Sequence, residues 1–251
     1  MNGESAAAAA AAQAGEPELD RLELADWRRR VADLYGEVRT IAATDPLAAW
    51  ERWRSVRESL YREHVESPVP VAERGSFRAR HWAYDPAFRF EVGVTVKEEA
   101  AAPAEAAGPS AAVGATTAGL GGLSGFAGFG SLLLPLSTGG EQTFTRIGFV
   151  DVPFTAGERR LGLYWMAGYA GGLFLPFRDA TNGAETYGAG RYLLDSAKSA
   201  DLGGNTAKRT LILDFNFAFQ PSCSFDPRWS CPLSPPENRL DLRIEAGERL
   251  T

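Results

Sequence analysis

The hydrophobic period of this chain changes once, from helical to extended, and this change limits the possible folds. Before residue 67, apolar residues recur every three or four positions. After residue 74 they alternate with polar residues or form short runs bounded by turn residues. Helices followed by a run of strands predict an α+β, mainly β domain, because a doubly wound sheet would alternate the two. We expect N-terminal helices over 20–66 and a β region over 74–250, closed as an antiparallel β-barrel or stacked as a sandwich-like sheet.

Two amphipathic helices are expected before the β region. The first begins near Leu19, with Asp26 as a fair cap for its main part. The second has a clearer start, because Thr44-Asp45-Pro46 offers a capping side chain followed by proline at a first helical position. Ser67-Pro68 ends it. The apolar stripes contain Trp27, Val31, Leu34, Tyr35 and Val38 in the first helix, and Leu47, Trp50, Trp53, Val56 or Arg57, and Leu60 in the second.

The clearest strand covers 88–97, where apolar and polar residues alternate strictly. Asn182-Gly183 favours a two-residue hairpin turn between two later strands. The remaining strands are expected over 75–84, 142–150, 158–166, 172–178, 185–194, 209–219 and 239–245.

Composition divides the chain into one domain and two atypical segments. Residues 1–18 are Ala-rich and acidic, which predicts a disordered tail. Residues 98–140 consist mainly of Ala, Gly, Ser, Thr and Pro, which predicts a low-complexity insertion. The Gly-rich run 119–130 lacks the Lys-Ser/Thr of a phosphate-binding loop. We therefore expect a single domain over 19–251 that is interrupted by the insertion 98–140.

Charge and hydropathy exclude several classes of partner. The formal net charge of −6 argues against general nucleic-acid binding, which requires a basic surface. No apolar run approaches the roughly 20 residues that span a bilayer. The first 20 residues lack the basic start of a secretory signal. We expect a cytoplasmic protein with no nucleic-acid or membrane partner, whose Cys223 and Cys231 are free thiols. The oligomeric state is not indicated.

Polar side chains concentrate on the later strands. If these strands are neighbours, Arg178, Glu185, Tyr187, Arg191, Asp214 and Asn216 line one polar patch. Two arginines hold a carboxylate or phosphate in a forked geometry, and Asp214 or Glu185 is a possible general base. An ordinary solvated face with cross-strand ion pairs explains the same residues. The full candidate ligand site comprises Arg178, Asp179, Glu185, Tyr187, Arg191, Asp214, Asn216, Glu237, Asn238 and Arg239.

No residue pattern identifies a catalytic group, cofactor or metal site. Two cysteines and two distant histidines are a poor basis for a zinc site. The chain also lacks the Gly-x-Ser-x-Gly motif of serine hydrolases. Whether the protein is an enzyme is therefore left open.

The same polar residues fall in motifs that resemble a known family, the bacterial and archaeal proteins catalogued as domain of unknown function 1684. The resemblance spans most of 44–249. It implies a single domain and no known activity, and no established catalytic or binding residue comes with it. The motifs are 174–192, Leu213-Asp-Phe-Asn216, the Cys223 to Cys231 segment, 231–240 and Ala246-Gly-Glu248.

Two functions of different classes follow. In the first, the domain binds a small polar or anionic ligand through a polar face of the sheet. In the second, it is a non-catalytic interaction or structural protein that uses the N-terminal helices or the 98–140 insertion.

Overall fold

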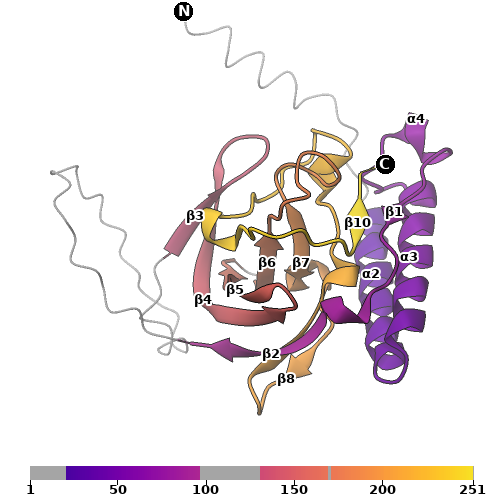
Figure 1. Ribbon diagram of the computed structural model, residues 1–251. Coiled ribbons are helices and arrows are strands. Elements are labelled where there is room, and N and C mark those ends of the chain that lie inside the picture. Colours follow the sequence, from indigo (N-terminus) through magenta and orange to yellow (C-terminus); the bar gives the residue numbers. More distant parts are fainter. Residues whose placement is uncertain (1–20, 97–130, 169–170, 251) are drawn as a thin grey trace, which may run out of the picture.

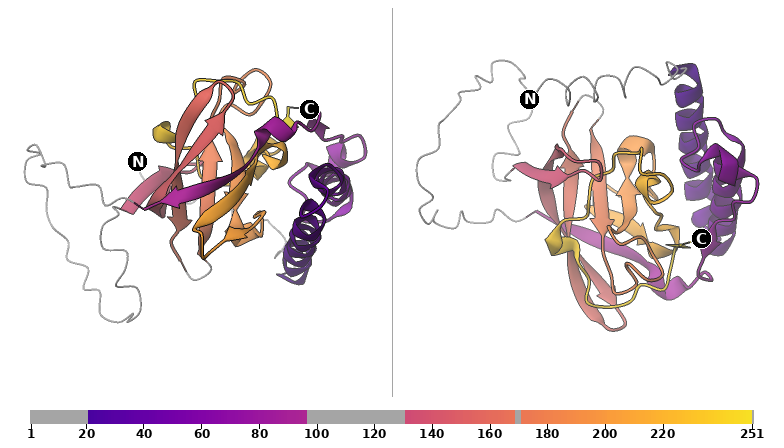
Figure 2. Two further views of the ribbon diagram at one scale, coloured as in Figure 1. Left: turned by 60° about the horizontal axis from the view of Figure 1, so that its bottom comes forward. Right: turned by 90° about the horizontal axis from the view of Figure 1, so that it is seen from above.

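The computed structural model describes residues 21–96, 131–168 and 171–250. Within these ranges a pair of helices stands beside a curled antiparallel sheet (Figure 1). Figure 2 shows both helices on the same side of the sheet in two further views. The α+β, mainly β prediction is confirmed, and the sheet is a curled half-barrel. The tail predicted for 1–18 and residues 98–130 of the predicted insertion lie outside the described residues.

Local sequence signals explain the helices. Helix α2 covers Arg21–Ala42, α3 covers Pro46–Glu63 and the short α4 covers Val71–Arg74. The Asp45 carboxylate accepts the backbone N–H of Ala48 at 3.0 Å, so the predicted cap of α3 is confirmed. Most of the two stripes faces inward, with Trp50 and Trp53 buried, whereas Leu47 at the start of α3 is exposed.

The main sheet has the strand order β7-β6-β5-β4-β2-β9-β8, and β3 also pairs with β4. All of its strand pairs are antiparallel. A separate two-stranded sheet joins β1 to β10. The strands are β1 Arg80–His81, β2 Arg89–Thr95, β3 Ser131–Pro135, β4 Glu141–Phe154, β5 Gly157–Met166, β6 Gly172–Phe177, β7 Arg191–Asp195, β8 Gly204–Asn205, β9 Thr210–Asp214 and β10 Glu248–Arg249.

The sheet curls because one long strand changes partners along its length. One end of β4 pairs with β3, whereas Phe149 and Val150 farther along pair with β2. At Gly148 a Cβ atom would lie 2.8 Å from the carbonyl oxygen of Thr95, so only glycine allows β2 this close. At the opposite edge, Tyr192 of β7 exchanges two backbone hydrogen bonds with Phe219. This bridge draws the segment after β9 toward β7 and narrows the open side of the half-barrel.

Several expected strands differ from the structure. The strand expected over 185–194 begins only at Arg191, because 178–190 form a long loop instead of a two-residue hairpin at Asn182-Gly183. The strand expected over 209–219 ends at Asp214, whose carboxylate accepts the backbone N–H of Asn216 and starts the 3-10 turn η3 (Phe215–Phe217). The segment 131–135, which the predicted insertion includes, is strand β3.

The strand expected over 239–245 is absent from the described residues for a specific reason. The backbone of 238–242 bonds to Arg178 and Ala180, and at Ile244 side chains take the backbone groups that a continued strand would need. The Ile244 carbonyl accepts from Arg191, and the Ile244 N–H donates to Asp179. Pairing resumes at β10, after Gly247 with a φ of 81° turns the chain.

The helices join the sheet through aromatic and charged contacts. The rings of Trp53 and Phe217 lie 5.3 Å apart, and Trp50 Nε1 donates to the Asn216 carbonyl at 2.9 Å. Arg57 of α3 forms a two-pronged ion pair with Glu248 of β10, at 2.6 Å and 3.0 Å. This junction therefore combines apolar packing with a buried charge pair.

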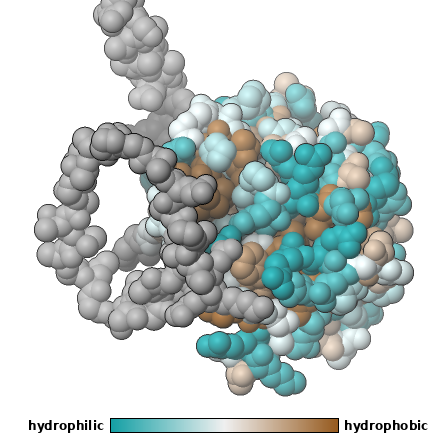
Figure 3. All heavy atoms as spheres, turned by 60° about the vertical axis from the view of Figure 1, so that its left-hand side comes forward, coloured by the Kyte–Doolittle hydropathy of each residue, from teal (hydrophilic) through white to brown (hydrophobic). Residues whose placement is uncertain are grey.

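The surface seen from the side of β3 and β4 is mostly hydrophilic, with hydrophobic residues gathered in a few places (Figure 3). Among the described helices, none combines the length and apolar character that crossing a membrane requires.

His81 at the junction predicts an acid-sensitive step in stability. Burial lowers its pKa to about 4, although nearby Glu248 acts to raise it. The unfolded chain takes up a proton near pH 6.5, whereas the folded protein does so only near the lower value. Stability should be full above pH 6.5 and should fall by up to about 3 kcal/mol as the pH drops toward 4.

Urea unfolding measured across this window tests the prediction. His81→Phe should flatten the loss between about pH 6.5 and 4. His64→Gln, which alters the other histidine, should retain it. If the free energy of unfolding falls equally steeply with pH in the two variants, His81 is not the responsible group.

Candidate functional site

The ten residues predicted as a ligand site do not gather in one place. Strands β6 and β7 are neighbours, but β9 pairs with β2 and β8. Asp214 and Asn216 bond to Tyr84, Asp85 and Arg89, whereas the Arg178 side chain bonds to the Ala189 carbonyl. Glu185 and Tyr187 lie in the loop before β7, so they do not share a strand face with Arg191.

Arg191 and Asp179 form a fully buried pair in the centre of the molecule. Arg191 donates to Asp179 at 3.4 Å and to the carbonyls of Ile244, Ala246 and Glu248. Its guanidinium lies over the Phe177 ring, 5.1 Å from the centroid. Burial lowers the pKa of Arg191, and Asp179 opposes this effect. The guanidinium is thus engaged in holding the C-terminal segment.

Asp214 and Asn216 form a second buried network around η3. Asp214 accepts from Tyr84 and Arg89, and burial raises its pKa despite these partners. The Asn216 amide exchanges two hydrogen bonds with the backbone of Asp85. This network fixes the turn before β2 against the turn after β9.

The remaining candidates occupy separate positions. Asn238 is buried, and its amide bonds to Gly162 and to the Pro176 carbonyl. Arg178 and Arg239 meet through a backbone bridge. Of the other three, Glu185 pairs with Arg243, Glu237 with Arg146 and Tyr164, and Tyr187 lies beside Cys223. The role of these ten residues in ligand binding stays a prediction.

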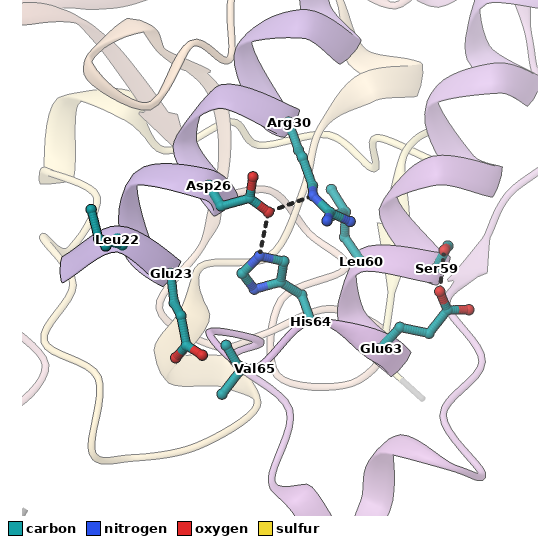
Figure 4. A pocket seen from close by; sticks show the side chains of 9 residues that line it. All are labelled: Leu22, Glu23, Asp26, Arg30, Ser59, Leu60, Glu63, His64 and Val65. Atoms are coloured by element: carbon teal, nitrogen blue, oxygen red, sulfur yellow. Dashed lines mark hydrogen bonds and ion pairs between the residues drawn. The ribbon is translucent and has the colours of Figure 1, made fainter. Parts of the chain in front are cut away.

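One hollow of about 390 Å³ lies where α2 begins and α3 ends (Figure 4). Asp26 Oδ2 is 2.7 Å from Arg30 Nε and 3.4 Å from His64 Nε2. His64 Nδ1 accepts the backbone N–H of Glu66, so Nε2 is the nitrogen that donates to Asp26. Desolvation acts to raise the pKa of Asp26, but the hydrogen bonds from His64 and Arg30 lower it overall.

This hollow is poorly arranged for nucleophilic catalysis. Both ring nitrogens of His64 are engaged. The hydroxyl in the hollow, that of Ser59, donates to Glu63 at 3.0 Å and points away from His64 (Figure 4). A serine nucleophile must instead contact its base.

A second hollow, here called the interlayer cavity, lies between the helices and the β part. It has a volume of about 320 Å³. Helices α2 and α3, strand β7 and the segments 198–200, 219–222 and 229–231 form its walls. Aromatic side chains dominate these walls: Trp27, Tyr35, Tyr61, Tyr192, Phe219 and Trp229.

Three cations line the interlayer cavity. Glu248 engages Nε and Nη2 of Arg57, which leaves Nη1 outside the fork. Lys198 lies 3.3 Å from Asp195, which raises its pKa, and its side chain is 62 % exposed. Arg28 is exposed and close enough for its charge to lower the pKa of Lys198.

The cavity walls also carry two buried polar atoms that lack partners among the described residues. They are Oε1 of Glu66, whose residue is only 7 % exposed, and Nε1 of Trp229. A buried polar atom without a hydrogen bond is costly, by about 1–3 kcal/mol. The cavity therefore offers one acceptor and one donor that an added molecule can satisfy.

Sequence reasoning did not find this cavity. Arg57 falls in the predicted apolar stripe of α3, and a cation at that position is the one local signal of a buried partner. Glu66, Lys198 and Trp229 have no such signal, because they meet only through tertiary contacts.

The comparisons with known proteins agree with the resemblance seen in the motifs. Residues 128–249 match the family described as "Protein of unknown function (DUF1684)", which confirms the resemblance over that range. The matched range begins before β3, and α2 and α3 precede it.

A solved relative supports the fold. The chain is similar to the solution NMR structure of an uncharacterized protein from Haloarcula marismortui, with 27% identity and a TM-score of 0.50. The match covers 78% of this chain and 90% of that chain. A comparison with curated proteins gives no significant match. Neither description names a ligand, a reaction or a partner.

The buried pair predicts that Asp179 is required for folding. Asp179→Ala should destabilise the protein by about 3–5 kcal/mol, because it leaves the Arg191 charge buried without its carboxylate. Glu185→Ala, which removes a half-exposed carboxylate of the same loop, should cost less than about 1 kcal/mol. Urea unfolding of both variants tests this, and similar costs would contradict the structural role of Asp179.

Proposed function

We propose that the protein binds a small molecule with an aromatic or apolar body and an anionic group, and that the interlayer cavity holds it. The observation that carries this proposal is that six aromatic side chains and three cations line the same cavity. The cavity volume of about 320 Å³ suits a small metabolite. Apolar walls with a few polar groups are typical of ligand sites.

The cations favour an anionic ligand group. Lys198 is paired with Asp195, and Arg28 is close enough for its charge to oppose that of Lys198, so an added anion would be attracted to both cations. Arg57 also lines the cavity, and its Nη1 lies outside the fork with Glu248. A carboxylate or phosphate gains charge-assisted hydrogen bonds from such donors.

The unpartnered wall atoms add a second requirement. Glu66 is a hydrogen-bond acceptor and Trp229 a donor. A ligand with its own O–H or N–H group could satisfy Glu66, and a carbonyl or hydroxyl oxygen could satisfy Trp229. The ligand class is therefore a polar anion with an aromatic or apolar part.

This proposal keeps the predicted ligand class but moves the site. Most of the predicted residues already bond to backbone or side-chain groups of the fold, so binding through them would break existing bonds. We rank the interlayer cavity first because Glu66 and Trp229 each keep one unpartnered polar atom in its wall. A cytoplasmic location stays a prediction from the sequence.

The alternative of a protein-interaction role has weaker support. The apolar stripes of α2 and α3 pack against the sheet, as Trp50 and Trp53 show. Apart from the exposed Leu47, the stripes are thus already covered. Residues 98–130 lie outside the described ranges and add nothing to either proposal.

A ligand screen with matched variants tests the proposed function. Thermal shift and tryptophan fluorescence should respond to one class of small anions, because bound ligand stabilises the native state and Trp27 and Trp229 line the cavity. Arg28→Ala with Lys198→Ala should weaken that binding by about tenfold or more, since two charged contacts are lost.

The control changes two exposed cations outside the cavity, Arg29→Ala with Lys208→Ala. It removes the same net charge and should leave the affinity unchanged. Equal weakening in both double variants would show general electrostatic attraction and contradict the cavity site. The absence of any response to small anions would overturn the proposal itself.

A further inference from the structure

The chain has two cysteines, and the fold brings them together. Cys223 lies in the 3-10 turn η4 (Ser222–Ser224), and its backbone N–H donates to Cys231 Sγ at 3.3 Å. Both are free thiols. Cys231 is fixed by Ser137, which accepts its N–H at 3.0 Å and donates to its carbonyl at 3.0 Å. The pair is thus held in place by β-region contacts.

The surroundings of the two sulfur atoms are unequal. The Cys231 thiol and Tyr187 act as hydrogen-bond donors to Cys223 and lower its pKa, although burial acts to raise it. The bond to Cys223 and burial both raise the pKa of Cys231. Burial and the same contact raise the pKa of Tyr187 to about 12. One sulfur is therefore stabilised as the thiolate and the other keeps the shared proton.

Such an arrangement separates two chemical roles. Thiolates, and not thiols, attack oxidants. A neighbouring thiol can then resolve the oxidised product as a disulfide. Hydrogen peroxide is small enough to reach a residue that is 8 % exposed, as Cys223 is, and Cys231 lines the interlayer cavity.

We propose that Cys223 and Cys231 form a peroxide-reactive dithiol, in which Cys223 is the attacking sulfur and Cys231 the resolving one. The Cys223 thiolate attacks one oxygen of hydrogen peroxide. The O–O bond breaks, Cys223 becomes a sulfenic acid, and the leaving hydroxide combines with the proton that the Cys223 thiol released on ionising, which gives the first water. Cys231 sulfur then attacks the sulfenic sulfur, and its proton leaves with the hydroxyl group as water. Overall, two thiols are oxidised to one disulfide and one peroxide is reduced to two waters.

The second step follows from the loss of charge in the first. A sulfenic acid carries no negative charge at sulfur, so it no longer holds the proton on Cys231 as the thiolate did. Cys231 then deprotonates more easily and attacks its neighbour. The proposal does not depend on the ligand of the interlayer cavity.

The test treats the intact reduced protein with hydrogen peroxide. Thiol titration should show the loss of both thiols. Intact mass should fall by two hydrogen atoms, and non-reducing electrophoresis should show a monomer. Dithiothreitol should restore both thiols. Added glutathione serves as the positive control for oxidation. If it is oxidised while both protein thiols persist, the proposal is overturned. Disulfides found only between chains would also overturn it.

Variants assign the two roles. Cys231→Ser should give a sulfenic acid on Cys223 that a 1,3-diketone reagent traps. Cys223→Ser should react at least about tenfold more slowly, because burial still raises the pKa of the Cys231 thiol and disfavours its thiolate. Equal reactivity of the two single variants would contradict the assignment.

Tyr187→Phe tests the chemical environment with little change in volume. It removes a hydrogen bond to the thiolate, so oxidation should slow by about fivefold at neutral pH. Tyr84→Phe, a tyrosine bonded to Asp214 instead, is the matched control and should react at the wild-type rate. This comparison stays informative if a cysteine variant fails to fold, and an unchanged rate in Tyr187→Phe would contradict the role of Tyr187.

Discussion

The ion pair between Arg57 and Glu248 is the interaction on which the arrangement of helices and sheet depends. Both side chains are nearly buried, at 13 % and 3 % exposure. Glu248 also accepts the backbone N–H of Gln220 at 2.7 Å, and Arg57 lies over the rings of Tyr61 and Phe219. Burial acts to raise the pKa of Glu248, but Arg57 lowers it overall. Removing one partner would leave an unpaired buried charge, which is far more costly than the pair itself.

This pair links parts of the chain that are distant in sequence. Arg57 belongs to α3, Gln220 follows η3, and Glu248 lies in the last strand. Two residues before Glu248, the Ala246 carbonyl accepts from Arg191 of β7. The C-terminal segment is thus held from one side by a helix and from the other by the sheet. The same geometry places Arg57, Phe219 and Gln220 in the wall of the interlayer cavity.

Sequence periodicity predicted the elements whose stability is local. The α3 cap at Asp45 and the alternation in β2 depend on neighbours within a few residues, and both are confirmed. The strand expected over 239–245 was wrong because Ile244 bonds to Asp179 and Arg191, far back in the chain. The 3-10 turn after β9 had a local signal in Asp214-Phe-Asn216, since a short carboxylate readily accepts the N–H two residues ahead.

The candidate site was harder to predict because a sequence shows polar groups but not how they are used. Asp179, Arg191, Asn216 and Asn238 are the kind of residues that bind ligands, yet each bonds to distant backbone groups within the fold. A ligand would have to break those bonds, at roughly 1–3 kcal/mol for each buried group left unpaired.

Groups with unused hydrogen-bonding capacity do not carry that cost. Glu66 and Trp229 have buried atoms without partners among the described residues, and Arg57 keeps one nitrogen outside its ion pair. The density of polar residues in a motif therefore points to the network that builds the fold. In the interlayer cavity, the polar atoms that the network leaves unsatisfied mark a place where a ligand can add hydrogen bonds.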